Sequence, residues 1–105
     1  MFEQVEALEA ELGDVESRLA DPAVIGDPGQ LEAGGRRHKE LEAALAIGRP
    51  LRAAGEDLDA ARELLKAADG EERDQLQVEI SSLEEEIERL ERELRVRLLP
   101  RDPNA

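Results

Sequence analysis

Residues 71–99 read EERDQLQVEISSLEEEIERLERELRVRLL, and this stretch decides the fold. Its apolar side chains recur at alternating intervals of four and three residues, which is the spacing of a heptad repeat with isoleucine at a and leucine at d. The seam consists of Leu76, Ile80, Leu83, Ile87, Leu90 and Leu94. No glycine or proline interrupts the sequence between Gly70 and Pro100. The stretch therefore predicts a long helix whose apolar stripe must be covered by another helix.

Glutamates flank this seam and restrict what can cover it. They occupy the g positions Glu79, Glu86 and Glu93 and the e positions Glu84 and Glu91. A parallel homodimer would set glutamate against glutamate, and each such contact costs about a few tenths of a kcal/mol. We therefore expect the seam to pack against helices of the same chain.

The preceding sequence carries the same three-four rhythm in two further segments. The first spans about residues 2–20, with its stripe at Val5, Leu8, Leu12, Val15 and Leu19. The second spans about residues 28–68, but its rhythm slips where Pro50 lies, so we expect it to be kinked or broken near Ala46–Pro50. A short turn at Asp69-Gly70 makes the second and third segments antiparallel neighbours.

The predicted fold is all-α: an antiparallel, three-helix, coiled-coil-like bundle. One domain is expected over residues 1–99, with helices at about 2–20, 28–68 and 71–99, and residues 100–105 are expected to open a linker. Two Asp-Pro pairs lie in the first connection, and the pair at Asp27 is typical of an N-cap followed by proline at the first helical position. Val24 and Ile25 are expected to pack against the end of the bundle.

Composition excludes several classes of function. The 105 residues carry a net charge of −13, one aromatic residue and no cysteine, so disulfides and cysteine-based zinc sites are excluded and direct DNA binding is disfavoured. The sequence has no secretory h-region and no apolar run of about 18 residues, which predicts a cytoplasmic protein without a membrane partner. Residues 31–52 reverse the charge sign, with five bases against three acids.

No catalytic, cofactor-binding or metal-binding residues are predicted, so the chain is not expected to be an enzyme. His38 occupies a seam position, where a packed or partly exposed histidine is typical. The glutamates at 84–88 face several directions on one helix and do not form an oxygen cage. Arg36, Arg37 and Lys39 are the candidate contacts with a phosphate-rich or acidic partner, and the alternative is that they only complement neighbouring helices.

Three strings carry a resemblance to a known family. They are Leu-Ala-Asp-Pro-x-Val-Ile-x-Asp-Pro-x-x-Leu at 19–31, Glu-Leu-Glu at 40–42 and Leu-Leu-Pro-Arg-Asp-Pro-Asn at 98–104. Together they resemble the N-terminal domain of the bacterial peptide chain release factor 1 family, the class-one factors that terminate translation. The match covers the whole chain but a third or less of such a factor, which implies truncation before the codon-reading and Gly-Gly-Gln domains.

The resemblance implies a non-catalytic docking domain. In the family this domain helps position the factor on the ribosome near the base of the large-subunit stalk, and it is implicated in communication with the GTPase release factor. Stop-codon-dependent peptidyl-tRNA hydrolysis belongs to the absent domains. The alternative from the residues alone is a stand-alone acidic coiled-coil scaffold that binds a basic partner helix. The chain departs from the family at His38, Gly48 and Leu51, where aromatic residues are usual, and at Pro50, where the helix is usually continuous.

Overall fold

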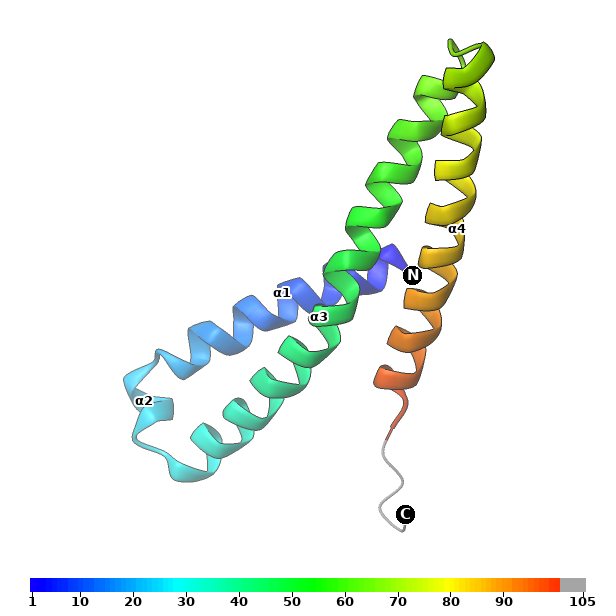
Figure 1. Cartoon of the computed structure of the whole chain (residues 1–105). Helices are drawn as coiled ribbons and strands as arrows, with labels where there is room; N and C mark the ends of the chain where they lie inside the picture. The colour runs from blue at the N-terminus through cyan, green and yellow to red at the C-terminus, as the bar shows by residue number, and fades with distance from the viewer. Residues whose placement is uncertain (101–105) are drawn as a thin grey trace. The chain divides into compact units, whose positions relative to one another are not determined.

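The computed structural model describes residues 1–100 and contains four helices in this range, with no strand (Figure 1). They are α1 (Phe2–Leu19), α2 (Pro22–Ile25), α3 (Pro28–Leu65) and α4 (Gly70–Leu98). The predicted all-α fold is confirmed, and the three long helices match the predicted segments to within a few residues. The linker expected at 100–105 lies, beyond Pro100, outside the described residues.

The chain divides into two compact units, and each is described separately. Unit 1 is Met1–Ala46 and unit 2 begins at Ile47. Helix α3 contributes to both, because the boundary falls inside it. The expectation that residues 1–99 form a single domain stays a prediction.

In unit 1, α1 and the first part of α3 form an antiparallel pair, with α2 in the connection between them (Figure 1). The two Asp-Pro pairs start helices there. Asp21 has an extended backbone and its carboxylate accepts the Ala23 N–H at 2.9 Å. The Asp27 carboxylate accepts from the backbone N–H groups of Gly29 and Gln30 at 3.1 and 3.2 Å. These bonds satisfy donors that a helix start leaves without partners.

The connection is ordered, as the sequence predicted, but only part of its apolar content is covered. Val24 is half-buried, whereas Ile25 is 53% exposed. The prediction for Ile25 is therefore wrong. Ile25 is the last residue of α2, a helix of a single turn. The sequence did not predict this helix, because four residues are too few to show a helical period, and so it gave no information on which side chains of the turn face solvent.

Apolar side chains of α1 and α3 supply the buried residues of unit 1. Four come from α1 and three from α3: Val5, Leu8, Leu12, Val15, Leu41, Ala44 and Leu45. Gly34 has a packing role at the other end of this helix pair. A Cβ atom at Gly34 would lie 2.9 Å from Cδ2 of Leu19, so the absence of a side chain lets the end of α1 lie close to α3.

Helix α3 runs through Pro50 without a break. The structure therefore has one helix where the sequence left open a kinked helix or two separate ones. Proline has no N–H, so the carbonyl of Ala46 lacks the donor that a helix normally supplies. Ala46 is exposed, and water can hydrate this carbonyl.

In unit 2, the last part of α3 and α4 form an antiparallel helical hairpin (Figure 1). Gly70, in the turn that the sequence predicted, has φ of 57°, a left-handed conformation that glycine adopts without strain. The guanidinium of Arg73 donates to the carbonyl of Leu65 at 3.1 Å and thereby satisfies an end of α3.

The heptad seam of α4 is unevenly covered. Leu76, Leu90 and Leu94 are buried, whereas the middle of the seam, Ile80, Leu83 and Ile87, is half-buried. Within unit 2 one helix pairs with α4, and two of its four buried apolar residues, Leu51, Ala54, Leu58 and Ala61, are alanines. A single helix with short side chains covers less of a stripe than two helices would.

Helices long and apolar enough to cross a membrane are absent from residues 1–100.

Candidate functional site

The predicted contact residues lie in the first part of α3, within unit 1. Successive residues of an α-helix are rotated by about 100°, so Arg36 and Lys39 share one side of α3 and Arg37 points elsewhere. The three bases therefore do not form one patch, although they are almost adjacent in the sequence.

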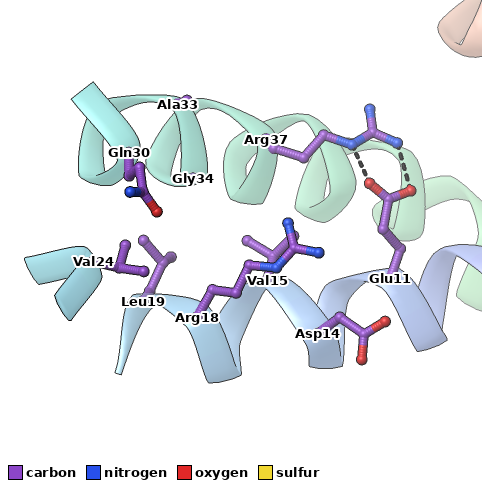
Figure 2. Close-up of a pocket in the computed structure, with 10 residues that line it drawn as sticks. All are labelled: Glu11, Asp14, Val15, Arg18, Leu19, Val24, Gln30, Ala33, Gly34 and Arg37. Carbon is purple, nitrogen blue, oxygen red and sulfur yellow. Dashed lines mark hydrogen bonds and ion pairs between the residues drawn. The ribbon is translucent and has the colours of Figure 1, made fainter. Parts of the chain in front are cut away.

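Arg37 faces α1 and is committed to an intramolecular ion pair. Its Nε and Nη2 atoms both donate to the carboxylate of Glu11, the latter at 2.7 Å (Figure 2). Its Nη1 atom donates to Glu40 at 3.0 Å. The hydrogen bond from Arg37 lowers the pKa of the Glu11 carboxyl, and the bonds to Glu11 and Glu40 raise the pKa of Arg37. The position of Arg37 thus agrees with the alternative in which these bases complement a neighbouring helix.

Arg36 and Lys39 are more available. Arg36 pairs with Glu32 one turn earlier at 3.1 Å, and both side chains are well exposed. Such a pair contributes little and exchanges readily with solvent or with another anion. Lys39 is exposed and forms no ion pair within residues 1–100. Of the three predicted contact residues, Arg36 and Lys39 are therefore the two that no cross-helix ion pair holds.

A pocket of about 320 Å³ lies beside the Arg37–Glu11 pair, bounded by α1, α2 and α3 (Figure 2). Val15, Leu19 and Val24 supply apolar walls, and Arg18 reaches into the gap from α1. The full lining is Glu11, Asp14, Val15, Arg18, Leu19, Val24, Gln30, Ala33, Gly34 and Arg37. Chemically, this lining offers guanidinium donors above an apolar floor, with carboxylates at its margin.

His38 lies between carboxylates from two helices, an arrangement that sequence reasoning missed. Its Nε2 atom is 3.5 Å from Oε2 of Glu16 on α1 and 3.7 Å from Oε1 of Glu42 on α3. The imidazole is 32% exposed, as expected for a seam histidine. The proximity of His38 and Glu42 could have been predicted, because residues four apart on one helix are neighbours. The approach of Glu16 could not, because it depends on how α1 and α3 align.

Comparison with known proteins gives the family. The PCRF domain model matches residues 8–105. The chain belongs to the PCRF domain family. This PCRF chain is 40% identical over 104 residues to peptide chain release factor 1 of Geobacter sulfurreducens, covering 99% of this chain and 29% of the relative.

Further relatives agree. Peptide chain release factor 1 of Acidobacterium capsulatum is 35% identical over 104 residues, with 99% and 29% of the two chains covered. That of Mycobacterium sp. strain KMS is 41% identical over 100 residues, covering 95% of this PCRF chain and 27% of the relative. No solved structure matches significantly. The chain thus spans less than a third of the length of these relatives, and the resemblance to the release factor 1 family is confirmed.

Proposed function

We propose that this PCRF chain is a non-catalytic docking domain of a translation termination factor, and that it helps position the factor on the ribosome near the base of the large-subunit stalk. The observation that carries the proposal is the family match over residues 8–105 together with relatives that are release factors. The whole factor would direct stop-codon-dependent peptidyl-tRNA hydrolysis in the cytoplasm, through domains other than this one. The GTPase release factor is the second proposed partner.

The arrangement of charge supports a limited, specific contact with ribosomal RNA. The strongly acidic chain is repelled by a polyphosphate surface over most of its length. Arg36 and Lys39, exposed on one side of α3, form a place in unit 1 where phosphate can approach without breaking a cross-helix ion pair. Arg37 is proposed to hold α1 against α3 rather than to touch the ribosome.

Competition in a reconstituted termination reaction tests the docking role. Excess chain added to ribosomes with a stop codon in the decoding site should slow peptide release by a limiting amount of intact factor. It should produce no release when added alone. An unchanged release rate at high excess of the chain would argue against docking, and release by the chain alone would contradict the non-catalytic assignment.

Charge reversal tests the proposed contact residues. In an intact factor carrying this domain, Arg36→Glu with Lys39→Glu should weaken ribosome binding and reduce the dependence of affinity on salt. The matched control is Lys66→Glu with Arg89→Glu, which changes the net charge equally at exposed bases of unit 2. Equal losses in both variants would mean that net charge, and not this side of α3, controls binding.

The alternative function is a stand-alone acidic scaffold for a basic partner helix. It is favoured by the exposed glutamates of α4 at 84, 85, 86 and 88, with the exposed Val78 on the same helix. Sedimentation discriminates the two, using a synthetic basic amphipathic helix as the probe. A scaffold should form a salt-sensitive complex with it at micromolar concentration, whereas a docking domain should remain a monomer.

A further inference from the structure

Three side chains of the types that bind metal ions converge in unit 1, and none of them belongs to the Arg37–Glu11 pair. They are Glu16 on α1 and His38 and Glu42 on α3, and one ligand atom from each lies within 4.8 Å of the others. Imidazole nitrogen and carboxylate oxygen are both common ligands of divalent transition-metal ions. Because two helices supply them, a bound ion would link α1 to α3.

The charges of this cluster lack a permanent counter-ion. Glu16 and Glu42 form no ion pair with an arginine or lysine within residues 1–100, and their recorded partner is His38. The adjacent Arg37 is occupied by Glu11 and Glu40. With a neutral imidazole the cluster brings two negative charges together, and a divalent cation would neutralise both.

The distances agree with those around a tetrahedral ion. Bonds from zinc to histidine nitrogen or carboxylate oxygen measure about 2.0–2.2 Å, which places two ligands of a tetrahedral site about 3.3–3.6 Å apart. The observed separations from His38 Nε2 are 3.5 Å to Glu16 and 3.7 Å to Glu42. Rotation of the exposed glutamate side chains, 56% and 48% exposed, can bring the third separation into the same range.

We propose that Glu16, His38 and Glu42 bind one divalent transition-metal ion, with zinc as the representative species and water in the remaining position. The imidazole argues against calcium and magnesium, which take oxygen ligands. The acidic residues of α4 differ in this respect, because no histidine lies among them. The site would stabilise the helix pair of unit 1 and is independent of the docking role proposed above.

Titration of the untagged 105-residue chain with zinc chloride tests the proposal. The chain contains a single histidine, so its ring C–H signals in a proton NMR spectrum report on His38 without ambiguity. We expect saturable binding of one zinc per chain, a shift of those signals, and a higher melting temperature because zinc binds the folded state. Magnesium at the same concentration should produce none of these changes.

Variants separate a built site from general attraction to an acidic protein. His38→Gln and, independently, Glu16→Gln should each weaken zinc binding by about tenfold or more, by analogy with the losses caused when residues supporting a metal site are changed. Glu32→Gln is the matched control, since it removes one exposed carboxylate of α3 outside the cluster and should leave affinity unchanged. Circular dichroism verifies that each variant is folded, and Glu16→Gln alters a side chain that is 56% exposed.

Two results would overturn the proposal. One is zinc affinity that falls equally in Glu32→Gln and Glu16→Gln, which would mean diffuse binding by surface carboxylates. The other is one-to-one binding that leaves the His38 signals in place, which would put the ion elsewhere on the chain.

Discussion

Unit 1 and unit 2 share helix α3 but are stabilised by different means. In unit 1 the starts of α2 and α3 are capped by aspartate side chains, whereas α1 has no side-chain cap, and Arg37 joins α3 to α1 through two hydrogen bonds to one carboxylate. In unit 2 the N-cap residue of α4, Asp69, makes no side-chain cap bond. The recorded cross-helix ion pair there, Arg62 to Glu84, is longer at 3.8 Å.

The two units also differ in how much apolar surface they leave exposed, and unit 2 leaves more. Unit 2 leaves the middle of its seam half-buried and exposes five large apolar side chains, Leu64, Val78, Val96, Leu98 and Leu99, whereas unit 1 exposes three, Phe2, Ile25 and Leu31. The difference teaches that a regular heptad pattern does not by itself set how tightly a helix pair is held. Helix ends and specific polar contacts distinguish two units whose stripes look alike in the sequence. Four predictions test this comparison, beginning with the largest effect.

Alanine substitution of one leucine in each unit should give unequal losses of stability. Leu41 is 1% exposed, so Leu41→Ala should lower the free energy of unfolding by about 2–5 kcal/mol. Leu83 is half-buried, and Leu83→Ala should cost only about 1 kcal/mol. Urea denaturation followed by circular dichroism measures both. Equal losses would mean that the middle of the α4 seam is as well covered as unit 1.

The helix caps give the next contrast. Asp27→Ala should lower the melting temperature clearly, because the carboxylate caps two backbone N–H groups of α3, whereas Asp69→Ala should change little. The hydrogen bond from the Gln30 backbone lowers the pKa of Asp27. Its folded-state pKa thus lies below the unfolded one, so the stabilisation is present above the ordinary value of 3.8 and is lost as the pH falls below it.

The difference in melting temperature between Asp27→Ala and wild type should therefore be smaller at strongly acidic pH than at neutral pH. Thermal melts at the two pH values measure it. Asp27→Asn is the control, since an asparagine can still cap the helix without titrating. A gap that stays constant with pH would show that the carboxylate charge has no part in the cap.

Two adjacent glycines of α3 sharpen the description of unit 1. Gly35 faces open space, so Gly35→Ala should raise the free energy of unfolding by about 0.5–1 kcal/mol through helix propensity alone. Gly34→Ala should raise the free energy of unfolding by less, because the new Cβ atom would lie 2.9 Å from Cδ2 of Leu19 and must displace that side chain. Paired chemical denaturation curves measure the difference. An equal gain at both positions would show that Leu19 yields without cost.

Double-mutant cycles on the two cross-helix ion pairs should show the smallest effects. Glu11 with Arg37 should give a coupling energy of about 0.5–1 kcal/mol, the upper end for exposed pairs, because the geometry is bidentate. Arg62 with Glu84 should give nearly zero at its longer distance.

The Glu11 coupling should also depend on pH. The hydrogen bond from Arg37 lowers the pKa of Glu11, so the coupling is present above the ordinary value of 4.5 and is lost as the pH falls below it. A coupling energy at Arg62–Glu84 as large as that at Glu11–Arg37 would show that the two units do not differ in the strength of their cross-helix ion pairs.

Local sequence signals predicted most of the secondary structure. Heptad spacing located the three long helices, the Asp-Pro pair placed the start of α3 at Asp27, and Gly70 marked the last turn. Helix α2 escaped prediction because one turn has no period. The uneven burial of Ile80, Leu83 and Ile87 escaped as well, because it depends on the side chains of the covering helix.

The candidate site was predictable only in its local part. The pairing of Arg36 with Glu32 and the proximity of His38 to Glu42 follow from spacing along one helix. The approaches of Glu11 to Arg37 and of Glu16 to His38 require the alignment of α1 with α3, which no local signal sets. The rotation of about 100° per residue already separates Arg37 from Arg36 and Lys39, which the sequence treated as one group, and the alignment of α1 with α3 gives Arg37 its partner Glu11.

The continuity of α3 has a practical consequence for anyone wishing to cut this chain into pieces. Cutting it between Ala46 and Ile47 would create two new, uncapped helix ends. Roughly four carbonyl groups in one fragment and a similar number of amide N–H groups in the other would lack hydrogen-bond partners. Pro50 softens the damage slightly, since it never had an amide hydrogen to lose. Each fragment would need a new cap before its behaviour could stand for that of the parent.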